Sequence, residues 1–502
     1  MKKKGEIMRE GQYEIQTIST DLLSEMSEER NFGDIGLKCV ILVPYYNGCF
    51  SKEKNLPPLP HLFDIPLIEH TIFSAKKAGI DDFVVILMKE DKSFQNQMDK
   101  LSHKANITIT TIYLNSTKNK LNLSFPNAQN NGLDSILLIK ANYYINFQIF
   151  EKLIENHHKN NYVLLAIDRG IDDFNLDYLE NTNKVLMDDQ NCIQKVGPKL
   201  PEYNALVPEI LFFPSEFLTK YGKDIVIENN FSLNKTIEIY QNSNLIQTVD
   251  IGRNKWIKVE ENSSKKRAEK LILKNLVKPT DGFISRYFIR KMSTNFLTPF
   301  ILKINSRVTP NQVSFLSFIV ALISSGFFFF GNAFLGAIFI QLANTIDHSD
   351  GEIARLKHKE SPFGDFLDAV FDRTADIFVY LGILCYLMFE IANKVIIGIY
   401  WSSTSIIIVC VLALAGNVMV SYVSTKAMTN LDYSFNGRFF GTGRGRDTRL
   451  FFIFIGGLLT LFHPIFLYFS MLIIATLTSS IVIHRTFVVW NHFKHDRGLV
   501  EQ

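Results

Sequence analysis

Residues 347–355 read DHSDGEIAR and residues 364–372 read GDFLDAVFD, and both stretches adjoin long apolar runs. At helical spacing, Asp347 and Asp350 share a face of the first stretch, while Asp368 and Asp372 share a face of the second. Charged side chains within apolar spanning helices are costly and usually functional. The two stretches therefore predict a site of facing carboxylates between two antiparallel helices, near one membrane surface.

The sequence around these stretches is apolar over lengths that can cross a bilayer. No charged residue occurs between Arg307 and Asp347, which is enough for two spanning helices of about 20 residues each, with Gly331-Asn332 as their turn. The other four spans are expected at residues 363–389, within 395–425, and on either side of His463-Pro464 within 450–483. This part is thus predicted to be an all-α domain of six transmembrane helices, preceded by an amphipathic interfacial helix over Phe283–Ile304.

Cationic residues predict the orientation of these spans. They cluster before span one, between spans two and three, between spans four and five, and after span six, whereas the opposite loops hold little beyond Lys394. Positively charged loops stay in the cytoplasm, so both termini, the soluble part and the carboxylate site are expected there. The first 30 residues lack an apolar h-region, so no secretory signal peptide is expected.

The composition indicates two unlike parts. The chain has 502 residues, too many for one ordinary core, and it is 47% hydrophobic, 13% aromatic and 21% charged. Its net charge of +3 gives no support to nucleic-acid binding. The five cysteines include no C-x-x-C pair, so neither a zinc site nor a disulfide framework is expected.

The part before residue 280 alternates short apolar runs with polar stretches. Strands are expected at Lys38–Tyr46, Asp82–Met88, Ile107–Leu114, Ser135–Ile139 and Tyr162–Ile167, and helices at Leu67–Ala78 and Phe147–His157. Alternating strands and helices favour an α/β domain with a mainly parallel, Rossmann-type sheet. No apolar run in this part is long enough to span a bilayer.

The carboxylates of the two opening stretches require nearby positive charge if they share a partly dry site. Oxygen-only ligands favour Mg²⁺ or Mn²⁺ over zinc, and two such ions can clamp a phosphate under attack. Gly351 would let a phosphate approach the backbone, and Arg355 could bind it. An ion-pair network with Arg355 and Arg373 is the alternative, which the excess of carboxylates over cations disfavours.

Together the two stretches spell D-x2-D-G-x2-A-R-x8-G-x3-D-x3-D, and so match at eight positions the signature of the CDP-alcohol phosphotransferase family. The chain resembles this family over about residues 278–485. The resemblance implies that Asp347, Asp350, Asp368 and Asp372 hold two Mg²⁺ or Mn²⁺ ions. It also implies that Asp372 is the general base that deprotonates the acceptor alcohol, which then attacks the β-phosphate of a CDP-alcohol and releases CMP.

The same resemblance implies the residues that hold the substrates. Contacts to the CDP-alcohol are expected from Pro310, Asn311, Gln312, Val313, Gly351, Arg355, Ser361 and Gly364. The arginine cluster is either a positive-inside signal or a pocket for a phosphorylated acceptor or lipid headgroup, and comprises Arg438, Arg444, Arg446 and Arg449. The family further implies a homodimer in membrane lipid. Asp376 could support the ligands, whereas Asp365, His348 and His358 are predicted to be polar surface residues.

The junction over residues 276–313 resembles bifunctional proteins that join an inositol-1-phosphate cytidylyltransferase to a di-myo-inositol phosphate phosphate synthase. In such enzymes a glycine-rich loop, a lysine and two metal-binding aspartates serve nucleotide transfer. The corresponding positions here read Pro44–Cys49, Leu56-Pro57-Pro58, Asn142 and Lys258. Residues 37–272 are therefore predicted to be a nucleotidyltransferase-like domain that has lost catalysis.

The predicted order is an extension (1–36), the nucleotidyltransferase-like domain (37–272), a juxtamembrane amphipathic segment (273–308), the membrane domain (309–490) and a cytoplasmic tail (491–502). The leading hypothesis is a CDP-alcohol phosphotransferase with an inert front domain, acting on inositol phosphate or making a phospholipid from CDP-diacylglycerol. One alternative keeps both activities, so that the protein makes and uses CDP-inositol. A cation-binding transporter is disfavoured, because no repeated bundle with broken helices is visible.

Overall fold

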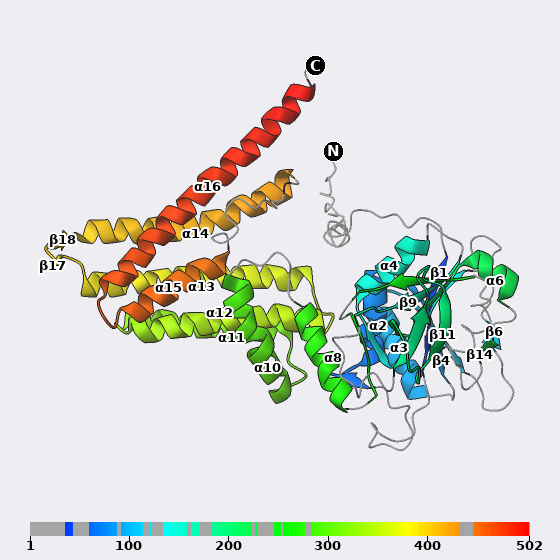
Figure 1. Cartoon of the computed structure of the whole chain (residues 1–502). Helices are drawn as coiled ribbons and strands as arrows, with labels where there is room; N and C mark the ends of the chain where they lie inside the picture. The colour runs from blue at the N-terminus through cyan, green and yellow to red at the C-terminus, as the bar shows by residue number, and fades with distance from the viewer. Residues whose placement is uncertain are drawn as a thin grey trace, which may run out of the picture.

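The chain folds into an α/β part and a helical part that lie side by side (Figure 1). The computed structural model describes residues 36–43, 60–87, 92–113, 121–122, 134–157, 162–170, 182–222, 226–227, 245–252, 255–260, 262–276, 284–431, 433, 435 and 445–500. Helix α8 (Asn262–Asn275) lies between the two parts in the chain and contacts both of them.

A seven-stranded sheet forms the centre of the α/β part, in the order β15-β9-β13-β7-β1-β4-β5. Its strands are β1 (Leu37–Leu42), β4 (Asp82–Leu87), β5 (Thr108–Tyr113), β7 (Ser135–Lys140), β9 (Val163–Ile167), β13 (Leu211–Phe213) and β15 (Ile246–Asp250). Only β13 among them runs antiparallel to its neighbours. All five predicted strands are present, so the prediction of a mainly parallel α/β sheet is confirmed.

The central strands β1, β4, β7 and β9 are largely apolar because the middle of the sheet is buried on both faces. Successive residues of β1 point to opposite faces, so Cys39 and Ile41 join one hydrophobic cluster while Val40 and Leu42 join another. The helices of this part are α2 (Leu67–Lys77), α3 (Lys92–Ala105), α4 (Phe147–His157) and α6 (Ser215–Tyr221). Helices α2 and α4 were predicted, but α3 was not, because its sequence is mostly polar and only four of its residues are buried.

Shorter strands complete the α/β part. A three-stranded sheet consists of β10 (Asn183–Met187), β11 (Ile193–Gly197) and β12 (Ala205–Val207). Two-stranded pairs are formed by β2 (His61–Leu62) with β3 (Ile65–Pro66), β6 (Leu121–Asn122) with β14 (Val226–Ile227), and β8 (Tyr143–Ile145) with β16 (Trp256–Lys258).

The helical part contains the long apolar helices. They are α11 (Pro310–Phe329), α12 (Ala333–Leu356), α13 (Pro362–Glu390), α14 (Ser403–Leu431), α15 (Arg446–Leu459) and α16 (Ile465–Val500), with a short hairpin of β17 (Lys394–Ile396) and β18 (Ile399–Trp401) before α14. Gly331 has a φ of 85° in the predicted turn between α11 and α12, a conformation that favours glycine.

Three stretches among the described residues are long and apolar enough to cross a membrane, namely α11, α14 and Ile465–His492 of α16. They indicate a membrane protein. These three stretches do not confirm the predicted count of six spans. The predicted spans α12 and α13 carry the carboxylates, and α15 has only 14 residues.

The segment before α11 is helical from Ser285 to Ile304, in alternating π and α turns η2 (Ser285–Ile289), α9 (Arg290–Met292), η3 (Ser293–Leu297) and α10 (Thr298–Ile304). Its polar side faces α12, where the Thr294 and Thr298 hydroxyls each donate to the buried carboxylate of Glu352 at 2.6 Å. Its other side is exposed and mostly apolar, and its large apolar side chains are Tyr287, Phe288, Met292, Phe296, Phe300 and Ile304. The predicted amphipathic helix is thus present, with its polar face turned toward the protein.

The α/β and helical parts meet at the loop that follows α12. The His358 ring stacks on Phe73 of α2 with centroids 4.0 Å apart, and its Nε2 lies 3.4 Å from Nδ1 of His70. Burial lowers the pKa of His70 to about 4 and also lowers that of His358, so both rings are neutral at pH 7. The prediction that His358 is a surface residue is therefore wrong, because it lies in the contact between the two parts.

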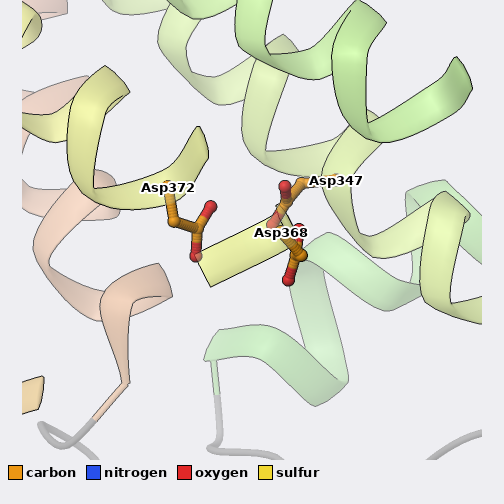
Figure 2. A group of neighbouring side chains, drawn as sticks. All are labelled: Asp347, Asp368 and Asp372. Atoms are coloured by element: carbon orange, nitrogen blue, oxygen red, sulfur yellow. The ribbon is translucent and has the colours of Figure 1, made fainter. Parts of the chain in front are cut away.

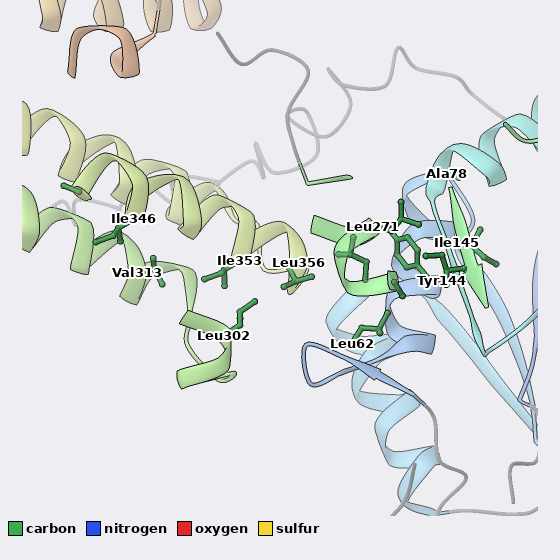
Figure 3. Close-up of a cluster of buried hydrophobic side chains, with 14 of the residues drawn as sticks. Leu62, Ala78, Tyr144, Ile145, Leu271, Leu302, Val313, Ile346, Ile353 and Leu356 are labelled. Carbon is green, nitrogen blue, oxygen red and sulfur yellow. The ribbon is translucent and has the colours of Figure 1, made fainter. Parts of the chain in front are cut away.

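One hydrophobic cluster continues across this junction (Figure 3). Leu62, Tyr144 and Leu271 contribute to it from the α/β side, and Leu302 and Leu356 from the helical side. The Nε of Arg355 also donates to the carbonyl oxygen of Leu276, just beyond α8, at 3.1 Å.

Replacing Gly382 with alanine should destabilise the helical part. A Cβ at this position would lie 2.7 Å from the backbone oxygen of Ser325, so α11 and α13 would have to move apart. Overpacking of this kind costs roughly 1–3 kcal/mol, and the apparent melting temperature of the detergent-purified protein should fall. Gly326→Ala is the matched control, because nothing lies within 4 Å of its Cβ. Equal melting temperatures for the two variants would contradict the close packing.

Candidate metal centre and nucleotide site

Three aspartates converge where α12 and α13 face each other. Asp347 of α12 and Asp368 and Asp372 of α13 each offer a carboxylate oxygen, and these oxygens all lie within 4.8 Å of one another (Figure 2). Asp368 and Asp372 are one helical turn apart, which places both on the side of α13 that faces α12. The structure therefore brings together three of the four predicted metal ligands.

Helix α11 supports the carboxylates of α12 through two serines. The hydroxyl of Ser314 donates to Oδ2 of Asp350, and that of Ser317 donates to Oδ1 of Asp347 at 3.2 Å. Asp350, the fourth predicted ligand, is thus held by α11 and is not among the three that converge. Sequence reasoning missed both serines, although their i, i+3 spacing near the start of an apolar helix is a signal that could have found them.

Arg446, at the start of α15, reaches into the carboxylate cluster. Its Nη1 lies 2.5 Å from Oδ1 of Asp372 and 3.2 Å from Oδ2 of Asp347, and its Nε donates to Oδ1 of Asp376 at 3.1 Å. A positive charge that is shared among three carboxylates lowers their mutual repulsion. The guanidinium therefore acts as the resident counter-ion of the cluster.

Asp376 is surrounded by partners and is only 1% exposed. Besides Arg446, it lies 3.1 Å from Nη1 of Arg373 and accepts a hydrogen bond from Asn417 Nδ2 at 2.9 Å. Its carboxylate positions these groups instead of facing open space. Arg373 also lies 3.5 Å from Asp372, whereas Arg355 bonds to a backbone carbonyl. The Arg373 half of the predicted ion-pair alternative is therefore present, with Asp372 and Asp376.

The cluster has the chemistry of a divalent-cation site. Oδ1 of Asp368 is buried and has no hydrogen-bond partner among the described residues, which is costly for a carboxylate unless a cation compensates it. A cavity of about 10 Å³ lies beside the other two aspartates, with Asp347, Asp372, Ser317 and Arg446 in its lining, and has room for about one water or ion. An all-oxygen set of ligands fits Mg²⁺ or Mn²⁺.

The predicted nucleotide contacts gather at the N-termini of α11 and α13. A Cβ at Gly364 would lie 3.1 Å from Oγ of Ser361 and 3.6 Å from Oδ1 of Asn311, so these three residues are neighbours. Ser361 caps α13 by accepting a hydrogen bond from the Gly364 N–H at 3.1 Å. The free N–H groups at the start of a helix favour anions such as phosphate.

Other predicted nucleotide contacts have structural roles in this arrangement. Gln312 accepts a hydrogen bond from the Thr309 N–H at 3.0 Å and so closes a capping box behind Pro310, while Val313 is buried. A Cβ at Gly351 would lie 3.2 Å from Nη1 of Arg355. Only glycine leaves the backbone beside this guanidinium uncovered.

Two of the four arginines in the predicted acceptor pocket, Arg446 and Arg449, lie within the described residues. Arg438 and Arg444 lie outside the described residues. Arg449 lies on α15 one turn beyond Arg446; it is 3% exposed, and its Nε and Nη1 have no hydrogen-bond partner in the described part of the chain. His348 pairs with Asp447 at 3.0 Å between α12 and α15, so the prediction that it is a surface residue is wrong.

The α/β part brings together Asn142 and Lys258, the residues at the predicted positions of the two lost aspartates. Strands β8 and β16 pair there, and the Val259 N–H donates to the carbonyl oxygen of Asn142 at 2.8 Å. The ammonium of Lys258 lies 2.8 Å from Glu260. The loop Pro44–Cys49 and residues 56–58 lie outside the described residues.

Asp368→Asn should weaken Mn²⁺ binding, measured by electron paramagnetic resonance of the free ion, because it removes a charged ligand from the converging set. Asp365→Asn is the matched control, since Asp365 is an exposed carboxylate on the same helix. The control should bind Mn²⁺ like the unmodified protein. Equal affinities for the two variants would contradict a metal centre at the cluster.

Comparison with known proteins agrees with this site. Residues 307–490 match the family model described as CDP-alcohol phosphatidyltransferase. A protein of Aquifex aeolicus (strain VF5) named bifunctional IPC transferase and DIPP synthase is 24% identical over 434 residues, 84% of this chain and 91% of its own length. A protein of the same name from Archaeoglobus fulgidus is 27% identical over 58% of this chain and 55% of its own length. The chain thus spans little more than half of the second relative.

Among solved structures, the inositol-1-phosphate CTP transferase from T. maritima covers 47% of this chain and 96% of its own, with 13% identity and a TM-score of 0.36. The phosphatidylinositol phosphate synthase of Mycobacterium tuberculosis with CDP-DAG bound covers 39% and 92%, with 23% identity and a TM-score of 0.33. Residues 307–490, which hold the carboxylate cluster and the apolar helices around it, are therefore the part of this chain that matches the CDP-alcohol phosphatidyltransferase model.

Proposed function

We propose that the protein is a membrane CDP-alcohol phosphotransferase, which moves a phosphoalcohol group from a CDP-alcohol to an acceptor alcohol and releases CMP. The observation that carries this proposal is the convergence of Asp347, Asp368 and Asp372 within the matched domain. Inositol phosphate is the favoured alcohol, because relatives are named for its transfer, including an archaetidylinositol phosphate synthase of Pyrococcus horikoshii that is 33% identical over 20% of this chain.

In this proposal, Asp347, Asp350, Asp368 and Asp372 hold two Mg²⁺ or Mn²⁺ ions, which when bound supply positive charge at the phosphate under attack. The carboxylate of Asp372 accepts the proton of the acceptor hydroxyl. It suits this role because it lies at the edge of the cluster beside the small cavity. Asp376 is the less suitable base, since three neighbours already occupy its oxygens.

The donor nucleotide lies at the start of α11 and α13 in this proposal. Asn311, Ser361 and Gly364 form one wall there, next to Pro310, Gln312 and Val313 of the first turn of α11. A phosphate of the donor would approach the backbone at Gly351 and meet the Arg355 guanidinium, where a methyl group would intrude.

The acceptor, if phosphorylated, is held by the arginines of α15. Arg449 is suited to this role because its buried guanidinium has hydrogen-bonding nitrogens without partners among the described residues. Arg446 is already shared among three carboxylates, so it would bind an acceptor phosphate only by giving up one of them. Arg438 and Arg444 complete the proposed pocket.

The membrane arrangement follows the charge pattern of the sequence. We place six spans in the bilayer at α11–α16, with the α/β part and the carboxylate cluster on the cytoplasmic side. The exposed apolar side of residues 285–304 lies in the lipid interface, which supports the juxtamembrane segment at 273–308. The other proposed domain boundaries are an extension over 1–36, the nucleotidyltransferase-like domain over 37–272, the membrane domain over 309–490 and a tail over 491–502. We also propose that the protein acts as a homodimer.

The direct test is CMP release by the purified chain, given CDP-inositol or CDP-diacylglycerol as donor and myo-inositol 1-phosphate as acceptor. Release should require Mg²⁺ or Mn²⁺ and stop on chelation, because the carboxylates otherwise repel a phosphate. Asp347→Ala should be inactive while remaining in the membrane, and the exposed-site control Asp365→Asn should be active. Full activity in excess chelator would refute the proposed mechanism.

Asp372→Asn separates proton transfer from substrate binding. The amide keeps the size and one oxygen of the side chain but cannot accept the proton, so turnover should fall by about 10²–10⁴, the usual value of a positioned general base. Binding of the CDP-alcohol, measured by isothermal calorimetry, should stay near that of the unmodified protein. Rescue to near-normal rates by added Mg²⁺ would instead make Asp372 only a ligand.

For the α/β part we propose a nucleotidyltransferase-like fold without catalysis. The bifunctional alternative is favoured by the relative that aligns over 84% of this chain. Against it, the adjoining positions 142 and 258 hold a neutral amide and an ammonium, so neither supplies the carboxylate that a Mg²⁺ site of this kind uses. The full chain should therefore release no pyrophosphate above background from CTP and myo-inositol 1-phosphate. Release that is lost in a Lys258→Ala variant would establish the bifunctional alternative.

A further inference from the structure

A cavity of about 510 Å³ lies at the junction of the α/β and helical parts. It is lined by Phe63, Asp64, Ile65, Glu69, Lys104, Ser306, Arg307, Lys357 and Lys359. None of these residues belongs to the carboxylate cluster or to the proposed nucleotide contacts. The volume is within the range of about 300–1,000 Å³ that is typical of sites for small ligands.

The walls of this junction cavity are held in place by specific contacts. Lys357 is buried, and its ammonium donates to the carbonyl oxygens of Ser306 and, at 2.6 Å, Val308, which joins the end of α12 to the segment before α11. Its neighbour His358 stacks on Phe73 and so ties the same loop to the α/β part. Lys357 and Lys359 therefore flank a residue that is locked between the two parts.

The charges of the lining favour an anion. It contains four cationic and two acidic side chains, and Lys104 already pairs with Glu69 at 2.6 Å. The ammonium of Lys357 is occupied by backbone carbonyls. Asp64, Arg307 and Lys359 remain, all three exposed, so the remaining side chains carry a net positive charge. A guanidinium beside an ammonium is the combination that binds phosphate oxygens well.

The position of the cavity suggests where such a phosphate comes from. Arg307 precedes α11 by three residues and Lys359 follows α12 by three, so both lie at the ends of a helix pair that is proposed to enter the membrane. A lipid headgroup and a phosphate in solution can both reach this level. We propose that the junction cavity binds a phosphate group through Arg307 and Lys359. This proposal does not depend on the reaction at the carboxylate cluster.

The experiment compares the full chain with Arg307→Gln/Lys359→Gln, using two probes. Inorganic phosphate is titrated at constant ionic strength while the apparent melting temperature is followed, and native mass spectrometry counts phosphatidylglycerol and phosphatidylcholine adducts in detergent. At least one phosphate-bearing probe should bind about tenfold or more weakly to the double variant, because each charge-assisted hydrogen bond is worth at least that factor. Lys303→Gln is the matched control, since Lys303 is an exposed cation of the same segment outside the cavity.

The outcomes separate the two sources of phosphate. Stabilisation by inorganic phosphate that is lost in the double variant identifies a soluble phosphate. Selective retention of phosphatidylglycerol over phosphatidylcholine that is lost in the same variant identifies a lipid headgroup. Should the double variant fail to fold, Arg307→Gln and Lys359→Gln are tested singly. The proposal is overturned if neither probe binds the unmodified protein, or if Lys303→Gln weakens binding as much as the cavity variants do.

Discussion

The repulsion among carboxylates buried between apolar helices is the constraint on which the helical part depends. Asp347, Asp368 and Asp372 converge within 4.8 Å, and Asp376 lies one turn further along α13. Negative charges at such distances in a medium of low dielectric constant must be compensated, or the helices would separate. Arg446 and Arg373 supply part of this compensation. A divalent cation held by the converging oxygens would supply the remainder, and Oδ1 of Asp368 has no other partner among the described residues.

The packing around the cluster follows from this constraint. Helix α11 carries no charge, yet it presents the hydroxyls of Ser314 and Ser317 to the carboxylates of α12. Close approach of the helices is possible because Gly382 of α13 faces the backbone of Ser325 on α11. Small and hydroxyl-bearing side chains therefore allow apolar helices to pack closely around a polar site.

The junction between the two parts gives the α/β part a role in this arrangement that does not require catalysis. The loop after α12 connects the two helices that carry the aspartates, and His358 of this loop is stacked on Phe73 of α2. The buried hydrophobic cluster is continuous from Leu62 to Leu356 across the same contact. The α/β part thus restrains the loop that connects the two halves of the carboxylate site.

Much of this molecule follows from its sequence, because the relevant signals are local. The five predicted strands are present, and the predicted apolar stretches correspond to helices α11–α16. Gly331 lies in the predicted turn between α11 and α12. The spacing of the aspartates alone placed Asp368 and Asp372 on one face of α13. The sequence did not reveal α3, whose buried residues are few, or that His348 and His358 are partly buried.

Only the tertiary structure decided which distant groups meet the aspartates. Arg446 is 99 residues from Asp347 in the chain, and Ser314 is 36 residues from Asp350. The neighbourhood of Asn311 and Gly364, and the cavity that joins Lys104 to Lys359, likewise depend on how helices pack. The helical periodicity of the sequence determines which face of a helix is polar, because that face is set by residues three or four positions apart in the chain. The partner of that face depends on the packing of the whole bundle, and no local pattern encodes it.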